Sequence, residues 1–333
     1  MKAIVYENYG SPDVLRCEEI DKPTPGDDEV LVKVRAASVN PLDWKLLKGG
    51  PAVVRILLGL GKTKIKRPGV DAAGEVEAVG RNITHPKPGD EVFGTCQGAF
   101  AEYATSKSAL GMKSLFVMKP YDVTFEQAAS APVAALTALQ GLRDKGRIQL
   151  EHKVLINGAA GGVGTFAVQI AKSFGANVTG VCSTRNVNMV RSLGADRIID
   201  YTQEDFTKSG ERYDVILDCV GNHSLSACRR VLNPKGTLVM VGAPGDAPVM
   251  GLLARLLGSI VLSWFLSKKM VFFIARVNNK DLTIVGELMA GGRVTPVIDT
   301  RYGLSEVPEA FRYVEGGHAR GKVVITLGHL RSG

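Results

Sequence analysis

Residues 153–174 read KVLINGAAGGVGTFAVQIAKSF, a short apolar run, a turn of Gly and Ala, and a stretch with the apolar spacing of a helix. Such a strand, turn and helix bind the pyrophosphate of a dinucleotide through backbone N–H groups and the positive end of the helix. Gly161 and Gly162 lack a Cβ and leave room for a phosphate, and Gly164 lets helix and strand pack closely. We therefore expect dinucleotide contacts from Ala160, Gly161, Gly162 and Val163. Ala159 replaces the first glycine of the usual fingerprint, so a purely structural turn is the alternative.

The end of the second expected strand bears on the choice between NADPH and NADH. An enzyme that uses NADH usually carries Asp or Glu about 20 residues after the glycine turn, where the carboxylate binds the ribose hydroxyls. Residues 181–186 read VCSTRN and contain no carboxylate. Ser183 and Arg185 can instead donate hydrogen bonds to a 2′-phosphate, so the pattern favours NADPH. The alternative is that Arg185 is a solvent-exposed residue at the start of a helix.

The pattern of apolar residues, Gly and Pro divides the chain into two parts. A doubly wound parallel sheet is predicted from about residue 124, because helical stretches alternate there with apolar runs at 153–156, 177–181, 214–217 and 237–241. A small β-barrel is predicted before it, because Gly and Pro interrupt short strands at 29–35, 74–79, 91–93 and 101–104. After residue 277 we expect a helix, then a strand near 294–298, a helix near 307–314 and a strand at 322–327.

The composition limits the class of protein. A chain of 333 residues with 45% apolar content predicts two globular domains. The 41 Lys and Arg against 33 Asp and Glu give +8, but these residues are scattered, which favours small anionic ligands and no nucleic acid. The five cysteines are widely spaced and include no C-x-x-C pair, and the N-terminus lacks the apolar core of a signal peptide. We therefore expect reduced thiols and a cytoplasmic location.

Further motifs follow in order along the chain. They are ASVNPLD at 37–43, PGVDAAG at 68–74, PGDEVFG at 88–94, AFAEY at 99–103 and GKVVI at 321–325. Together with the glycine turn they resemble the medium-chain dehydrogenase/reductase superfamily over nearly the whole chain. The resemblance implies a GroES-like β-barrel catalytic domain at 1–123 and 277–333, and a Rossmann NADPH-binding domain at 124–276. It also implies a homodimer.

The superfamily has zinc and zinc-free branches, and the residues of this chain resemble the second. Zinc alcohol dehydrogenases carry Cys where this chain has Asn40, Gly-His-Glu at the place of residues 69–71, and Cys where we align Pro132. The side chains of Asn40, Val70 and Pro132 provide neither the thiolate nor the imidazole that zinc requires. Only Cys96 lies in the region of the four-cysteine structural zinc lobe. The chain is therefore similar to the zinc-free quinone oxidoreductases and enone reductases, and we expect no metal site.

The resemblance also assigns site residues. Asn40 and Asp43 would line the nicotinamide side of the cleft, and Lys45 is a candidate donor to an anion. The remaining cofactor contacts would come from Thr137, Tyr201, Cys219, Val220, Gly242, Phe272, Phe273 and Lys322. Each assignment has a structural alternative: Asp43 as a helix cap, Lys45 and Lys322 as ordinary surface lysines, and the two phenylalanines as members of a buried strand.

The absence of zinc ligands restricts the chemistry. Zinc polarises a carbonyl oxygen as a Lewis acid, so without it the hydride acceptor must already be electron-poor. Quinones and α,β-unsaturated carbonyls satisfy this condition, and we expect a small, apolar, electron-poor substrate. A non-catalytic NADPH-binding protein is one alternative. An enoyl-thioester reductase is another, but such enzymes place a tyrosine after the Asn-Pro-x-Asp stretch, and no Tyr occurs between Tyr9 and Tyr103.

An apolar segment lies late in the expected cofactor domain. Residues 249–266 read VMGLLARLLGSIVLSWFL. The segment approaches the length of a membrane span, but Arg255 interrupts it and it falls between two expected strands of one sheet. We expect a helix that covers the substrate cleft or forms a dimer contact, with peripheral membrane contact as the alternative.

Overall fold

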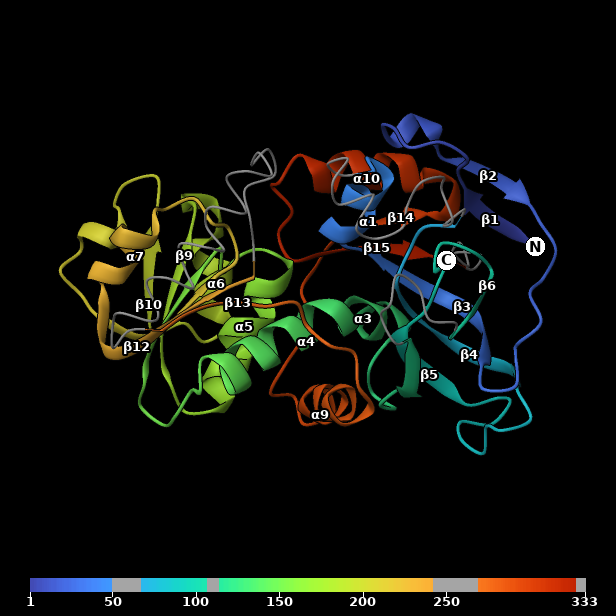
Figure 1. Cartoon of the computed structure of the whole chain (residues 1–333), viewed down its shortest axis with the longest axis horizontal. Coiled ribbons are helices and arrows are strands. Elements are labelled where there is room, and N and C mark those ends of the chain that lie inside the picture. The colour runs from blue at the N-terminus through green and yellow to red at the C-terminus, as the bar shows by residue number, and fades with distance from the viewer. Residues whose placement is uncertain (50–66, 107–113, 242–268, 328–333) are drawn as a thin grey trace. The chain divides into compact units, whose positions relative to one another are not determined.

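The computed structural model describes residues 1–49, 67–106, 114–241 and 269–327, which form two compact units (Figure 1). Unit 1 comprises Met1–Leu136, Arg276–Gly292 and Pro296–Gly333. Unit 2 comprises Thr137–Ala275 and Arg293–Thr295. The sequence places the boundary at residue 124, but the helix α3 (Phe125–Ser130) falls in unit 1. Its small buried residues pack on the strands β3 (Val30–Val39) and β4 (Asp71–Val79) of that unit.

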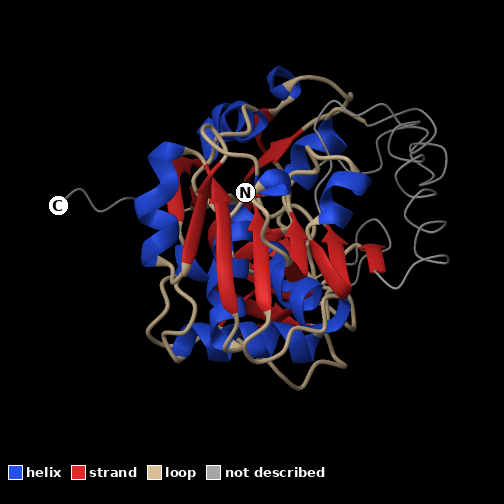
Figure 2. Cartoon of the chain, turned by 90° about the vertical axis from the view of Figure 1, so that its left-hand side faces the viewer, coloured by secondary structure: helices blue, strands red, loops and turns tan. Residues whose placement is uncertain are grey.

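Unit 2 is built on a parallel sheet, whose strands run side by side in the foreground of Figure 2. The strand order is β10-β9-β8-β11-β12-β13. The strands are β8 (Lys153–Asn157), β9 (Asn177–Cys182), β10 (Arg197–Asp200), β11 (Tyr213–Asp218), β12 (Leu232–Met240) and β13 (Lys269–Phe272). The chain winds outward in one direction from β8 and in the other from β11. This order is doubly wound, as predicted, and the switch point between β8 and β11 is where such sheets bind ligands.

The central strand β8 shows why the sheet is parallel. Val154, Leu155 and Ile156 are fully buried in succession, so both faces of the strand are covered. The helices of this part of the chain are α5 (Gly162–Ser173), α6 (Val187–Ser192) and α7 (Leu225–Arg230), with short turns η2 (Gly141–Lys145), η3 (Thr184–Asn186) and η4 (Phe206–Lys208). Helix α4 (Pro132–Gln140) begins in unit 1, and its residues from Thr137 on belong to unit 2. Helix α5 packs on β8 and β9, so the glycine turn stands at the end of the central strand.

Unit 1 is built on the sheet β14-β15-β3-β4-β5-β7, to which β6 adds beside β3. The strands are β3 (Val30–Val39), β4 (Asp71–Val79), β5 (Glu91–Thr95), β6 (Tyr103–Thr105), β7 (Leu115–Met118), β14 (Ile298–Gly303) and β15 (Lys322–Thr326), and β1 (Lys2–Val5) pairs with β2 (Arg16–Glu19). The helices are α1 (Pro41–Leu47), α3, α9 (Asn279–Ala290) and α10 (Val307–Glu315), with the turns η1 (Pro12–Val14) and η5 (Leu304–Glu306).

Strand β3 is the centre of unit 1, and its apolar residues form one core with those of α10 and the neighbouring strands. Val32, Phe100 and Phe311 are fully buried there, and the two aromatic rings meet edge to face at 5.8 Å. Most strands of this sheet pair antiparallel, whereas β14 and β15 run parallel. The terminal strand β15 thus pairs directly with the N-terminal part of the chain.

One predicted strand is wrong in its position. The strand expected near 294–298 begins only at Ile298. Before it, the N–H of Thr295 donates to Gln169 Oε1 at 2.7 Å, and Gln169 Nε2 donates to the Thr295 carbonyl at 3.0 Å. A side chain of α5 therefore satisfies the backbone groups that a strand partner would otherwise bind.

Two further expectations concern residues that the structure does not describe. The apolar segment 249–266 and Gly242 lie outside the described residues. In the part of the chain that is described, no helix combines the length and apolar character needed to cross a bilayer.

Candidate functional site

A cluster of buried polar side chains lies where three strands of unit 1 meet. The register pairs Ser38 of β3 with Asp71, the first residue of β4, and Val39 with Val323 of β15. The end of β3 is therefore flanked by the first residues of both neighbours. Asn40 follows β3 and precedes α1, and Lys322 is the first residue of β15. This topology places an amide, a carboxylate and an ammonium group together.

Hydrogen bonds connect these groups. Lys322 Nζ donates to Asn40 Oδ1 at 2.6 Å, and Asn40 Nδ2 donates to Asp71 Oδ2 at 2.9 Å. Asp71 also accepts from Ser38 Oγ at 3.2 Å and from the N–H of Val133 at 3.2 Å. Lys322 Nζ lies 3.6 Å from Asp71 Oδ2 and forms an ion pair with it. The cluster is therefore held by side chains from β3, β4 and β15 and by the backbone of α4.

Burial sets the electrostatics of this cluster. The side chains of Asp71 and Lys322 are 0% and 3% exposed. Burial raises the pKa of Asp71 and lowers the pKa of Lys322, because water no longer stabilises either charge. Their mutual attraction acts against both shifts. An ammonium group is thus built into the interior of unit 1, and the alternative that Lys322 is a surface lysine is wrong.

Asp43 is the second carboxylate of the cluster. Its Oδ2 accepts the backbone N–H of Asn40 at 2.8 Å, so Asp43 caps the first turn of α1. Burial raises the pKa of Asp43 to about 7, and the charge of Asp71 acts in the same direction. Lys322 and the N–H groups of Asn40 and Gly69 oppose this shift. The helix-cap role therefore describes the geometry of Asp43, while its predicted place beside a nicotinamide stays a prediction.

Lys45 lies apart from this network. It is on the exposed side of α1, and its ammonium lies 5.7 Å from the centroid of the Trp44 ring. The described structure gives it no contact with Asn40, Asp43 or Asp71. The geometry thus favours the surface alternative for Lys45.

The donor set does not fit a zinc ion. At the positions that the resemblance aligns with zinc ligands, this chain has the amide of Asn40 and the apolar side chains of Val70 and Pro132. Asn40 already binds Lys322 and Asp71 through both ends of its amide. Among the described residues, no group of three or more His, Cys, Asp or Glu side chains is arranged to hold a metal ion.

The glycine turn of unit 2 fits a dinucleotide. Gly158 has a φ of +85°, in the left-handed region that favours glycine. A Cβ at Gly164 would lie 2.0 Å from the Gly158 carbonyl oxygen, so only glycine permits α5 to start so close to β8. Gly161 is the N-cap of α5, and the N–H groups of the first turn have no acceptor within the helix. Ala160 lies in the turn before α5, and Gly162 and Val163 are the first residues of the helix; their contacts with a dinucleotide stay a prediction.

A carboxylate organises the loop after β11. Asp218 Oδ1 accepts the N–H groups of Val220 at 3.1 Å and Gly221 at 2.8 Å, and it also accepts from Asn157 Nδ2 at 2.8 Å. Asn157 is the last residue of β8, so the loop of Cys219 and Val220 is connected to the glycine turn at the switch point. Neither Asp218 nor Asn157 is part of the sequence prediction, although both end apolar strands at this edge.

The predicted ribose end contains one residue that the sequence argument missed. Ser183, Arg185 and Tyr201 lie after β9 and β10, with the last two exposed. Asp200, the end of β10, pairs in register with Cys182 and accepts from Thr184 Oγ1 at 2.5 Å. These hydrogen bonds lower the pKa of Asp200, so a carboxylate lies next to the proposed phosphate contacts. Asp200 is the last residue of the third strand in sequence, whereas the carboxylate that binds the ribose in NADH enzymes follows the second strand.

The remaining predicted contacts are in unit 2. Thr137 is half-buried in α4. Phe272 packs against the core around β12, and Phe273 lies against Gly141, with Lys145 Nζ 5.9 Å from its ring centroid. Phe272 is thus the partly buried last residue of β13, whereas Phe273 lies beyond the strand, and the contact of both with a nicotinamide stays a prediction.

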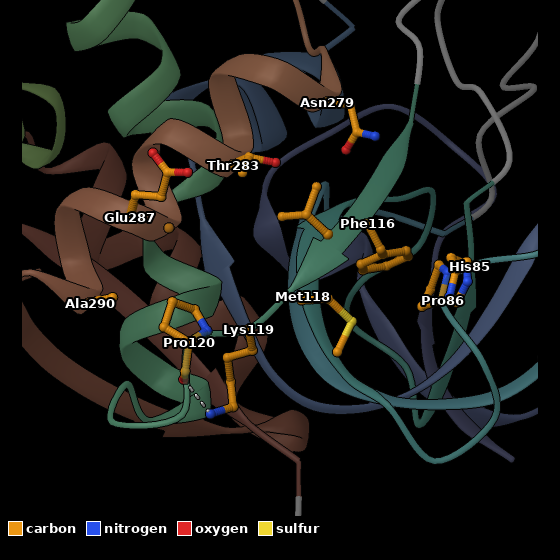
Figure 3. A pocket seen from close by; sticks show the side chains of 12 residues that line it. His85, Pro86, Phe116, Met118, Lys119, Pro120, Asn279, Thr283, Glu287 and Ala290 are labelled. Atoms are coloured by element: carbon orange, nitrogen blue, oxygen red, sulfur yellow. Dashed lines mark hydrogen bonds between the residues drawn. The ribbon is translucent and has the colours of Figure 1, made fainter.

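A groove of about 540 Å³ opens elsewhere on unit 1 (Figure 3). One wall is the face of α9 that carries Asn279, Thr283 and Glu287, and the other is formed by β7 and the residues after it. Lys119 donates to the Pro120 carbonyl at its base. No predicted site residue lines this groove, so it is separate from the polar cluster.

Comparison with known proteins gives the family. Residues 26–130 match the alcohol dehydrogenase GroES-like domain, and residues 193–325 match the zinc-binding dehydrogenase model. The chain is 33% identical to a chloroplastic quinone-oxidoreductase, QR1, of Triphysaria versicolor, over 98% of both chains. It belongs to the medium-chain dehydrogenase/reductase superfamily, in the quinone oxidoreductase and enone reductase branch.

Two further comparisons agree with this placement. The chain is 34% identical to 2-methylene-furan-3-one reductase of Solanum lycopersicum, over 98% of this chain and 79% of the other. The structure of the quinone oxidoreductase from Coxiella burnetii superposes with a TM-score of 0.84, at 30% identity over 98% of this chain and 99% of that one. The predicted fold is confirmed, and the chain is an NAD(P)H oxidoreductase of the quinone oxidoreductase type.

Proposed function

We propose that this oxidoreductase uses NADPH, without zinc, to transfer hydride to quinones or to the C=C bond of α,β-unsaturated carbonyls. The observation that supports this most is the buried set of Asn40, Asp71 and Lys322. It provides hydrogen-bond donors and an internal positive charge in place of metal ligands. A relative named as a quinone oxidoreductase and one named as a furanone reductase support both substrate classes.

For this reaction the protein has to provide little more than hydrogen-bond donors that stabilise a developing negative charge. Bound NADPH supplies the hydride, and the acceptor takes it at the β carbon of an enone or on a quinone. The π electrons of the acceptor then move to its oxygen, and water provides the proton. Asp71 and Lys322 hold the amide of Asn40 in place, and a preorganised donor such as its N–H stabilises an oxygen that gains charge.

The cofactor would be held by unit 2. The first turn of α5 offers its N–H groups to the pyrophosphate, and the loop ordered by Asp218 lies at the same switch point. Ser183, Arg185 and Tyr201 would receive the 2′-phosphate. Phosphate oxygens accept hydrogen bonds from all three side-chain types, and Arg185 adds charge.

A panel of hydride acceptors tests the reaction. We expect quinones and enones to be reduced with a kcat/KM at least about tenfold above that of saturated aldehydes, because without a Lewis acid only the electron-poor acceptors give a delocalised anion. NADPH consumption at 340 nm is the measurement. Faster reduction of saturated aldehydes would contradict the proposal, and binding of NADPH with no turnover of any acceptor would favour a non-catalytic protein.

Removal of metal ions tests the zinc-free mechanism. We expect activity within experimental error of the untreated enzyme after prolonged chelation, because the side chains of Val70 and Pro132 provide no ligand and both ends of the Asn40 amide are occupied. Elemental analysis of the same samples is the control. One zinc per chain, lost in parallel with activity, would refute the prediction.

A further inference from the structure

The amide of Asn40 is bound at both ends by groups of opposite character. Its Oδ1 accepts from Lys322 Nζ at 2.6 Å, and its Nδ2 donates to Asp71 Oδ2 at 2.9 Å. An ammonium group can only donate and a carboxylate can only accept. A rotation of the amide by 180° would place Nδ2 against the ammonium and Oδ1 against the carboxylate. Both contacts would then be repulsive, at a place where all three side chains are buried.

Asp71 is itself held in place. It also accepts from the Ser38 hydroxyl on β3 and from the N–H of Val133, and it is fully buried. Lys322 is anchored at its backbone, whose N–H donates to the Val297 carbonyl at 2.8 Å, and at its buried ammonium, which lies 3.6 Å from Asp71 Oδ2. The two charged residues therefore cannot move to follow a rotated amide. Only one orientation of the Asn40 amide is compatible with this framework.

We infer that Asp71 and Lys322 are positioning residues that fix which end of the Asn40 amide faces the substrate. Nδ2 carries two hydrogens, and Asp71 accepts one of them. The other has no partner among the described residues and remains a donor of fixed direction. The lysine strengthens this donor, because a hydrogen bond to Oδ1 polarises the amide.

This inference rests on the proposed function and adds a requirement to it. A donor of fixed direction suits an acceptor whose oxygen gains negative charge as the hydride arrives. An asparagine free to rotate would present its carbonyl oxygen part of the time and would repel that charge. The preferred substrates would therefore be those in which hydride addition places the electron pair on oxygen, such as enones and quinones.

Paired substitutions test the inference. Asp71→Asn or Lys322→Met alone leaves a charge buried without its partner, whereas the double variant removes both charges together. We expect the double variant to fold and to lose at least tenfold in kcat when both NADPH and a quinone are saturating. Lys119→Met is the matched control, because Lys119 is another buried lysine of unit 1, paired with Glu91 at 3.0 Å. It should keep kcat within twofold.

A second measurement is independent of turnover. In protein labelled with ¹⁵N-asparagine, the side-chain signals of Asn40, assigned through Asn40→Ala, should show one proton shifted downfield by the carboxylate and slow exchange with solvent. Both properties should be lost in the double variant. If that variant does not fold, Asp71→Asn combined with Lys322→Gln replaces it, because two neutral amides leave no buried charge, can accept or donate to either end of the Asn40 amide, and should give two sets of signals.

The outcomes separate the two proposals. Unchanged Asn40 signals in the variants would overturn the inference, as would altered signals with kcat within twofold of the parent. If the parent reduces no quinone or enone, the proposed function fails. The Asn40 signals then still decide whether Asp71 and Lys322 hold the amide.

Discussion

Replacing Asp43 by Asn is expected to remove a loss of stability that the parent protein shows between pH 4 and pH 8. The pKa of Asp43 is about 7 in the folded protein, against 3.8 for an ordinary Asp carboxyl. The folded state therefore holds a proton that the unfolded state releases. A raised folded pKa means that stability from this group is complete below pH 4 and decreases as the pH rises to 7. Three pH units correspond to about 4 kcal/mol in the free energy of unfolding.

The groups around Asp43 are included in this expectation. Asp71 and Lys322 act on its charge in opposite directions, and the pKa of Tyr6 is raised to about 12, mainly by burial, so that Tyr6 does not titrate in this range. Asn at position 43 still offers an oxygen to the N–H of Asn40, so the cap of α1 is kept. The difference in free energy of unfolding, variant minus parent, should therefore be larger at pH 8 than at pH 4.

Urea unfolding of both proteins at several pH values measures this difference. Glu18→Gln is the control, since Glu18 is an exposed carboxylate on β2 of the same unit. Its unfolding curves should run parallel to those of the parent across the whole pH range. If the stability of Asp43→Asn changed with pH in the same way as that of the parent, the prediction would be contradicted, because Asp43 would then already be ionised at pH 5 in the folded protein.

The preference for NADPH over NADH should decrease when Arg185 is replaced by Ala. Charge-assisted hydrogen bonds to a phosphate contribute roughly 1.5–3 kcal/mol, which is about 10- to 150-fold in affinity. NADH lacks the 2′-phosphate, so its dissociation constant should change little. Fluorescence titrations of both cofactors against parent and variant give the four constants. Equal affinity of the parent for NADPH and NADH would contradict the prediction.

Arg191→Ala is the matched control for this experiment. Arg191 is an exposed arginine in the last turn of α6, hydrogen-bonded only weakly to Asn188 at 3.5 Å. Its replacement removes the same charge from the same region without touching the residues that follow β9. We expect no change in the ratio of the two dissociation constants. A loss as large as that in Arg185→Ala would point to the overall positive charge of unit 2 instead of a specific contact.

The fold is largely predictable from sequence because its decisive contacts are local. Residues 153–174 contain a complete strand, turn and helix, and Gly164 is required by a contact only six residues away, with the Gly158 carbonyl. Strands buried on both faces are visible as apolar runs. The strand predicted near residue 294 is misplaced because the contact that decides its start is distant in sequence. The backbone of Thr295 is satisfied by a side chain 126 residues earlier, which no local pattern reveals.

The candidate site is less predictable for the same reason. Asn40 and Lys322 are 282 residues apart, and only the pairing of β3 with β15 brings them together. A lysine at the start of an expected terminal strand gives no sign of burial, and Asp71 is one carboxylate among many until the register places it opposite Ser38. Resemblance to a family supplies Asn40 and Asp43 as candidates, but the ion pair that holds the Asn40 amide requires coordinates.

The position of β15 also determines the order in which the units can be completed during protein synthesis. Unit 2 has every strand of its described sheet once Phe272 has been added, and its parallel sheet can form while the ribosome continues. The first strands of unit 1 are synthesised earlier, but its sheet is complete only when Lys322–Thr326 pairs with the edge of β3. Until then, Asp71 has no cationic partner. The first third of the chain therefore depends on residues made some 250 positions later. A ribosome stalled just before Lys322 would carry every strand of the described second sheet but an incomplete first sheet.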